Sequence, residues 1–132
     1  MTNPDELLAM MPFASTIGIA IECAGPDRTI GTLAWSPERC TAGGVIHGGA
    51  LISLADSVGA ICAFLNLPAG AGTATTNSTT TLLRAVRSGT VTAIGRPLHV
   101  GRTSIVVQTD LTDEAGRLVA QTTQSQAVLA SA

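Results

Sequence analysis

The chain has 132 residues, a length that suits a single domain over residues 1–132. Hydrophobic residues make up 45% of it, which excludes a largely disordered chain. The net charge is −2, and the basic residues are seven scattered arginines with no lysine. No basic surface is expected, so the composition predicts no nucleic-acid partner.

The cysteines favour a reducing compartment. They are odd in number and lack motif spacing, which argues against a disulfide framework. The first residues are acidic and lack the order of a signal peptide, so we expect a cytoplasmic protein. The long apolar run 45–67 contains His47 and Asp56 and has no basic or aromatic flanks, which predicts burial in protein rather than in a membrane.

The predicted elements begin with a short helix over residues 5–11, with Pro4 suited to its first turn. Apolar residues then alternate with small or polar ones over 17–23, the period of a half-buried strand. A loop over 36–46 leads into one long helix from residue 47 or 48 to about 66, closed by Pro68 and nearby glycines. The other predicted strands cover residues 29–35, 73–83, 90–100, 103–112 and 117–129.

This order predicts an α+β fold, in which a six-stranded antiparallel sheet wraps one long central helix. Apolar residues surround that helix on nearly all sides, so we expect it to be buried. Pro97 predicts an edge or a bulge in its strand. Six short strands leave part of the helix uncovered, and a second subunit is the natural cover. We therefore expect at least a dimer.

Asp56 is the only charged residue between Arg39 and Arg84. It lies in the middle of the apolar helix, where an unpaired carboxylate would cost several kcal/mol. Helical spacing places it on a stripe of small side chains that a ligand or another backbone can approach. Asp56 is therefore a candidate reactive carboxylate. The alternative is a structural ion pair with an arginine of this chain or of a partner.

The start of the helix is the second candidate feature. Its first N–H groups lack intrahelical acceptors, and Gly48 and Gly49 leave room for an approaching oxygen. Such a terminus can stabilise an oxyanion, although the two glycines also suit a tight turn. Asp56 lies roughly 12 Å further along the helix, too far to act easily on the same carbonyl. A site shared between two subunits would bring the helix start of one chain close to Asp56 of the other.

Other side chains offer less chemistry. His47 can cap the helix, orient the loop or act as an acid, and we favour a structural role. The cysteines have no paired base and no metal spacing, so we expect neither a thiol nucleophile nor a metal site. The serines lack a nucleophile-elbow motif.

The run Gly-Val-Ile-His-Gly-Gly-Ala-Leu-Ile-Ser-Leu-Ala-Asp over residues 44–56 resembles the hotdog-fold thioesterase superfamily. It is most similar to the phenylacetate-pathway and 4-hydroxybenzoyl-CoA (Arthrobacter-type) branch, in which His-Gly-Gly opens the central helix and an acid follows the first glycine by eight positions. Gly48 and Asp56 have that spacing. The similarity continues through 73–85, 101–103 and 113–116.

The resemblance implies a hotdog fold and hydrolysis of an acyl-CoA between two subunits. The Gly48 N–H would polarise the thioester carbonyl, and Asp56 would act as nucleophile or general base. Thr41 stands where relatives often have Asn or Gln, and Ala74 stands where they often have Ser or Thr. The resemblance implies no cofactor besides the coenzyme A of the substrate. Further implied substrate contacts are Gly49, Ser57, Thr73, Ala74, Thr75, Arg84, Arg87 and Arg102.

Several alternatives remain open at this point. A hotdog hydratase or dehydratase would use an acid–base pair, which His47 and Asp56 could supply. A non-catalytic acyl-CoA binder fits the absence of an amide side chain at Thr41. Apolar helix residues predict an apolar or aromatic acyl group but leave its identity open, as well as the choice between CoA and an acyl carrier protein, and between dimer and tetramer. The candidate pocket-lining residues are Ile52, Val58, Ile61 and Phe64.

Overall fold

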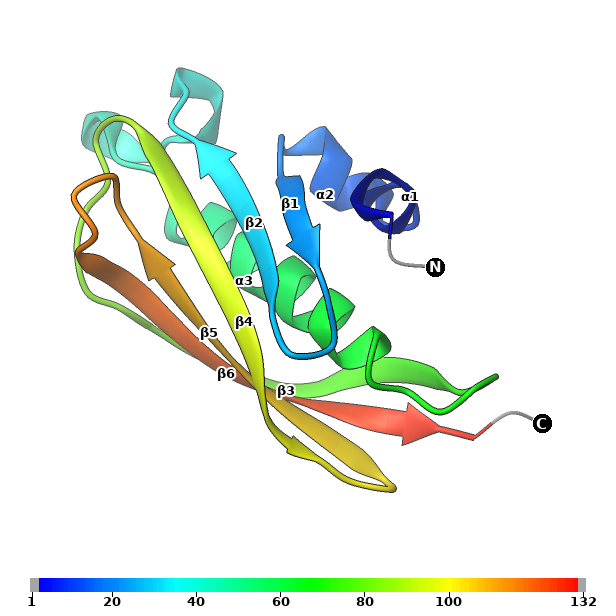
Figure 1. Cartoon of the computed structure of the whole chain (residues 1–132). Coiled ribbons are helices and arrows are strands. Elements are labelled where there is room, and N and C mark those ends of the chain that lie inside the picture. Colours follow the sequence, from blue (N-terminus) through cyan, green and yellow to red (C-terminus); the bar gives the residue numbers. More distant parts are fainter. Residues whose placement is uncertain (1–2, 131–132) are drawn as a thin grey trace.

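The computed structural model describes residues 3–130 and consists of one antiparallel sheet that curves around a central helix (Figure 1). The sheet has six strands in the order β1-β2-β4-β5-β6-β3. The helix α3 (Gly48–Phe64) lies on the concave face and contacts all six strands. The predicted α+β hotdog arrangement is therefore confirmed. The strands are β1 (Ala20–Ala24), β2 (Thr29–Ala34), β3 (Gly72–Leu82), β4 (Thr90–Val100), β5 (Ser104–Thr112) and β6 (Leu118–Leu129).

The N-terminal segment forms two short helices where one was predicted. Helix α1 (Pro4–Ala9) begins at Asn3, whose side chain accepts from the N–H groups of Asp5 and Glu6. Helix α2 (Pro12–Thr16) follows, with its own proline in the first turn. A proline at residue 12 cannot continue the first helix, because it lacks the N–H and its ring clashes with the preceding turn.

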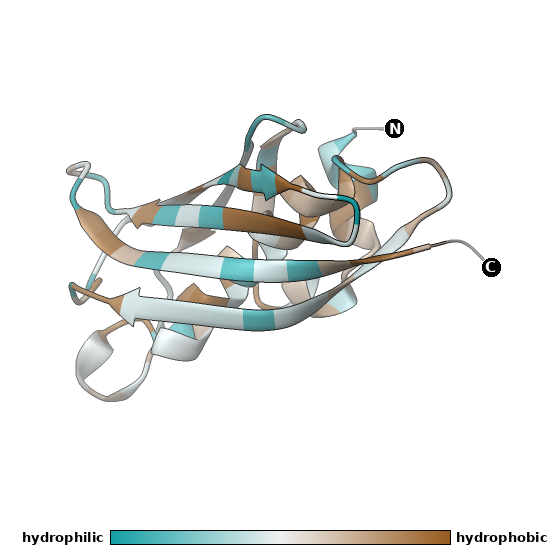
Figure 2. Ribbon diagram, turned by 90° about the horizontal axis from the view of Figure 1, so that it is seen from below, coloured by the Kyte–Doolittle hydropathy of each residue, from teal (hydrophilic) through white to brown (hydrophobic). Residues whose placement is uncertain are grey.

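The core lies between α3 and the inner face of the sheet. On β5 the alternate residues Ile105, Val107, Thr109 and Leu111 are fully buried, and Val58 of α3 packs against the backbone of β2 and β4. Pro97 lies next to an irregularity in the β4–β5 pairing, beyond the last residue of β4 that pairs with β2. That position satisfies the prediction of a bulge. Seen from the side opposite α3, pale and teal stretches of the strands alternate with brown ones (Figure 2).

Strand β3 crosses to the far edge of the sheet, where it pairs with β6 and not with its chain neighbour β4. The loop Ser36–Val45 before the helix contains two 3₁₀ turns, η1 (Pro37–Arg39) and η2 (Ala42–Gly44). Most β3 residues are exposed, and so are Ile52 and Phe64 of α3. One side of the helix and one sheet edge thus remain open together. Among the described residues, no helix is long and apolar enough to cross a membrane.

Candidate active site

Asp56 lies halfway along α3 and is half-buried. Its Oδ1 atom accepts two long hydrogen bonds, from Thr75 Oγ1 of β3 at 3.5 Å and from Gln124 Nε2 of β6 at 3.4 Å. Across residues 3–130 the ion pair found joins Arg117 to Asp113, so no arginine of that part neutralises Asp56. The structure therefore does not support a structural ion pair within the chain. It leaves a carboxylate held by neutral donors.

Two glutamines of β6 complete this side of the site, and sequence reasoning missed both. Gln124 and Gln126 are buried on the inner face of the sheet, with 0% and 1% exposure. Gln126 Nε2 donates to Thr75 Oγ1 at 2.7 Å, and its Oε1 accepts from Thr73 Oγ1 at 3.2 Å. Alternation along β6 predicts that both point inward. Two amides on the buried face of a strand are the signal that could have directed attention to them.

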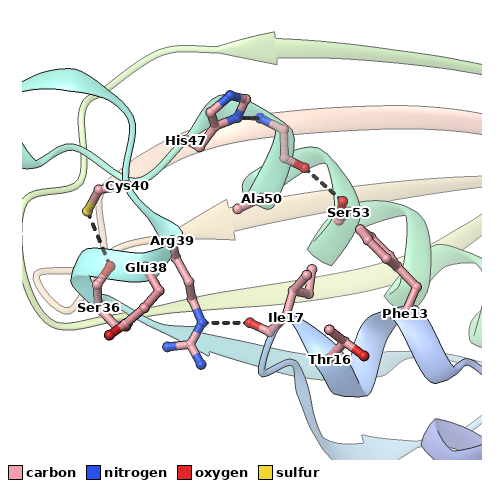
Figure 3. A pocket seen from close by; sticks show the side chains of 11 residues that line it. Phe13, Thr16, Ile17, Ser36, Glu38, Arg39, Cys40, His47, Ala50 and Ser53 are labelled. Carbon is pink, nitrogen blue, oxygen red and sulfur yellow. Dashed lines mark hydrogen bonds between the residues drawn. The ribbon is translucent and has the colours of Figure 1, made fainter.

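The start of α3 offers one free donor. The ring of His47 folds over the helix end, and its Nδ1 accepts from the Gly49 N–H at 2.8 Å (Figure 3). The N–H groups of Ala50 and Leu51 donate to the His47 carbonyl. In the part of the chain that the structure describes, Gly48 N–H has no acceptor. His47 therefore caps the helix, and Gly48 carries the N–H available to a ligand.

A hollow of about 330 Å³ lies beside this free donor. Gly48, Thr41 and Arg84 line it together with the aliphatic side chains of Leu51, Leu82 and Leu83. The structure thus brings together three of the candidate site residues, from the loop, the helix start and the end of β3. It does not bring Asp56 to them, because α3 is continuous and separates the two by roughly 12 Å.

A second, more apolar hollow of about 250 Å³ lies one helical turn beyond Asp56. Ala60 and Phe64 continue the Asp56 face of α3 into it, and Thr73 lines it from β3. The remaining lining residues are Leu7, Met10, Met11 and Ile61. Ile61 and Phe64, two of the candidate pocket-lining residues, thus line a hollow. Val58 does not, because it is fully buried against Gly31 and Gly95 of the sheet.

The other candidate residues are dispersed. Arg84 and Arg87 lie between β3 and β4, where Arg87 donates to the Gly43 carbonyl. Arg102 lies in the β4–β5 turn, at the opposite end of the 11-residue strand β4. The three arginines therefore cannot bind one phosphate group within a single chain. Ser57 is buried, and Ala74 is exposed on β3.

Another cleft, about 670 Å³ in volume, lies on the α2 side of the helix start (Figure 3). His47, Gly49 and Ser53 line it, but the Gly49 N–H is occupied by the His47 ring, and Ser53 Oγ donates to the Gly49 carbonyl. Arg39 spans its floor, where its guanidinium donates to the carbonyls of Ile17 and Ala34. The Gly49 N–H and the Ser53 hydroxyl are thus both engaged within the helix end, so neither is free to bind an oxyanion in this cleft.

The cysteines and the possible metal ligands of residues 3–130 do not favour a thiol nucleophile or a metal site. Burial raises the pKa of the Cys62 thiol to about 11, so that thiol stays protonated and unreactive at neutral pH. Among residues 3–130, no three His, Cys, Asp or Glu side chains gather as a metal ion would require. The structure also presents a helix-end donor at Gly48 and a carboxylate at Asp56, two kinds of group that acyl-transfer chemistry uses.

Comparison with known proteins agrees with that chemistry. The family model described as the thioesterase superfamily matches residues 43–120, which include both parts of the site. The chain belongs to the thioesterase superfamily. This thioesterase is 30% identical over 122 residues to the Mycobacterium tuberculosis protein Rv1847, named as an esterase, covering 90% of this chain and 87% of that protein.

Two further relatives are similar over nearly the whole thioesterase chain. The 1,4-dihydroxy-2-naphthoyl-CoA hydrolase of Escherichia coli is 28% identical over 127 residues, covering 94% of this chain and 93% of that protein. The crystal structure of thioesterase HI1161 from Haemophilus influenzae superposes with a TM-score of 0.92 at 29% identity, covering 98% of this chain and 92% of that chain.

Proposed function

We propose that this thioesterase hydrolyses a small aryl or medium-chain acyl-CoA in a site formed by two copies of the chain. One copy supplies the Gly48 N–H, which binds the thioester carbonyl oxygen, and the other supplies the Asp56 carboxylate. The observation that carries the proposal is the pair of separated half-sites. A free donor and a carboxylate without a cationic partner in residues 3–130 lie on one helix, but too far apart for one carbonyl.

The open surfaces support such a pairing. Strand β3 has one neighbour in the sheet, and its other edge presents unpaired backbone groups over 11 residues. Two β3 edges related by a two-fold axis would bring the open sides of two α3 helices together, in opposite directions. Gly48 of each chain would then face the carboxylate of the other. A dimer of such dimers is compatible with the free outer face of the sheet.

The chemistry follows from the two half-sites. Asp56 either takes a proton from water as that water attacks the carbonyl carbon, or attacks the carbon itself to form a mixed anhydride that water then hydrolyses. In both routes the negative charge develops on the carbonyl oxygen at Gly48. The C–S bond breaks as this oxyanion collapses, which gives the free acid in the first route and the mixed anhydride, before its hydrolysis, in the second. The coenzyme A thiolate leaves and takes a proton from protonated Asp56 in the first route and from water in the second. No cofactor is needed beyond the coenzyme A of the substrate.

The hollows suggest which substrates fit. The apolar one next to Ala60 and Phe64 would accept the acyl group, and its size favours an aryl or medium-chain group over a long chain. The E. coli relative hydrolyses an aryl-CoA by its name, in line with that choice. Arg84 lies at the edge of the Gly48 hollow, where a phosphate of coenzyme A would find a cation. Arg87, Arg102, Thr41 and Ala74 complete the set of proposed contacts, in a protein that we expect to be cytoplasmic.

A thiol-release assay over aryl, short-chain and long-chain acyl-CoAs tests the proposal. Asp56→Asn should lower kcat by a factor of about 1,000 or more while fold and oligomeric state persist. Asp110→Asn is the matched control, because Asp110 is a carboxylate of β5 that binds Gln121 in the sheet. Hydration of crotonyl-CoA without thiol release would identify a hydratase instead. Tight binding of acyl-CoA with no release from any of them would identify a binding protein.

A further inference from the structure

The carboxylate of Asp56 is contacted on one of its two oxygens. Oδ1 accepts from Gln124 Nε2 and from Thr75 Oγ1, whereas Oδ2 accepts from no group within residues 3–130. Resting on the proposed function, we propose that Gln124 is a positioning residue that orients Asp56, with Thr75 and Gln126 as its helpers. Oδ2 is then the oxygen that takes the proton or attacks the carbonyl carbon.

The burial of Gln124 is the first observation behind this assignment. Its side chain is fully buried, and its Oε1 has no hydrogen-bond partner in the described chain. A buried amide with an empty acceptor is unfavourable, and a methionine would fill the same volume without that cost. What the amide provides and an apolar side chain cannot is its Nε2 donor, which points at the Asp56 carboxylate and at the Asp56 carbonyl.

Residue 59 of the helix is the second observation. Gly59 is fully enclosed, and a Cβ atom there would overlap Oε1 and Cδ of Gln124. A glycine in the interior of a helix is unfavourable compared with alanine. The helix thus has a glycine one turn from Asp56, at the position that the Gln124 side-chain amide contacts. Two unfavourable features, Gly59 and the unpaired Oε1, serve the same contact.

Gln126 and Thr75 supply the second donor to Oδ1. Because Gln126 Nε2 donates to Thr75 Oγ1 at 2.7 Å, the hydroxyl proton of Thr75 is directed away from Gln126. The acceptor within reach is Asp56 Oδ1 at 3.5 Å. Gln126 is itself held by the Thr73 hydroxyl, so its amide orientation is defined. Strands β6 and β3 therefore present two donors to the same carboxylate oxygen.

Both bonds to Oδ1 are long, so they steer the carboxylate without immobilising it. Hydrogen bonds at catalytic carboxylates commonly tighten when substrate binds. With Oδ1 occupied by two donors, the lone pairs of Oδ2 remain available to a water or a carbonyl carbon. Because Oδ1 holds the carboxylate in place and Oδ2 reacts, loss of Gln124 should slow the chemical step and leave substrate binding almost unchanged.

Gln124→Met tests the inference, because it keeps the volume and removes the donor. In steady-state assays it should lower kcat by roughly 10- to 100-fold with KM changed less than about threefold. Thr122→Val is the matched control. Thr122 lies two residues earlier on the same buried face, and its hydroxyl pairs with that of Thr80 at 2.7 Å. That variant should lower the melting temperature and leave kcat unchanged.

A double-mutant cycle separates positioning from general damage. In the Asp56→Asn background, Gln124→Met should change the residual rate less than about twofold, because its effect acts through the missing carboxylate. Equal losses in both backgrounds, or an unchanged kcat in the single variant, would overturn the inference. Thr75→Val, which removes the other donor to Oδ1, should also lower kcat, and an unchanged kcat there would count against the assignment.

A structural readout keeps the inference separate from the proposed function. If Asp56→Asn releases thiol as fast as the wild type, the proposed function fails on its own. A crystal structure of Gln124→Met then decides the inference. A rotated or multiply oriented Asp56 carboxylate would support it, and a carboxylate unmoved from its present orientation would refute it.

Discussion

The side-chain amide of Gln124 lies directly against the backbone of Gly59, where β6 packs on α3. No side chain fits at residue 59, because a Cβ atom would overlap both Oε1 and Cδ of that amide. The contact joins the sheet to the helix one turn from Asp56. It therefore links the packing of the core to the geometry of the candidate site.

Gly59→Ala should destabilise the protein by about 1–3 kcal/mol, because the added methyl group displaces the buried amide. Thermal or urea unfolding measures the change. In a Gln124→Ala background, the space is vacated and the substitution should become neutral or stabilising, since alanine is the better helix residue by about 1 kcal/mol. A similar loss of stability in both backgrounds would show that Gln124 is not the obstacle.

We predict that His47 contributes to stability by capping the start of α3. His47→Ala should lower the free energy of unfolding by about 1 kcal/mol, because the Gly49 N–H loses its acceptor, whereas His47→Asn should retain most of the stability. The asparagine variant should also keep kcat within a few-fold of the wild type. Were His47 the acid of a hydratase or thioesterase, the asparagine variant would be stable but inactive.

Gly48 allows a substitution that removes its N–H and keeps the backbone conformation. Gly48→Pro places proline at the first position of α3, where it is well tolerated, and His47 already has the extended ψ of 133° that a following proline needs. We expect kcat to fall by about 100- to 1,000-fold. Gly48→Ala is the control, since it adds a methyl group near Leu82 but keeps the donor. Equal losses in the two variants would point to steric blockage and not to a lost hydrogen bond.

The cysteines should differ sharply in reactivity. Burial raises the pKa of the Cys62 thiol to about 11, so the thiolate is scarce below that pH and gains reactivity only as the pH rises toward it. Cys23 is exposed. Alkylation at pH 8 followed by mass spectrometry should find Cys23 modified and Cys62 unmodified until the protein is unfolded. Rapid modification of Cys62 in the folded protein would contradict this.

Much of the fold was predictable because the spacing of apolar residues along the chain indicates each helix and strand locally. The burial alternation of β5 appears within 9 consecutive residues and the apolar length of α3 within 17. The two proline signals, at residues 4 and 97, act on their own neighbours. The second short helix was missed, although Pro12 could have indicated it. Local sequence signals do not predict which distant strands pair. The position of β3 at the far edge, beside β6, therefore could not be predicted from them.

The candidate site also has one part that local sequence predicts and one part that depends on long-range contacts. Asp56 stands out in the sequence as a lone charge in an apolar helix, and Gly48 stands out as a helix start without side chains. Gln124 follows Asp56 by 68 residues, and nothing near either residue predicts that they meet. Even the burial of Gln124 required the register of β6, in which a shift of one residue would turn it outward.

Complementation between two inactive variants tests the shared site most directly. Gly48→Pro and Asp56→Asn subunits are purified separately, mixed in equal amounts and allowed to exchange, with heterodimer formation followed by native mass spectrometry. A heterodimer has one site with both defects and one with neither, so random exchange should restore about one quarter of wild-type thiol release. A mixture that contains heterodimers but stays as inactive as its parents would show that Gly48 and Asp56 do not act across two subunits.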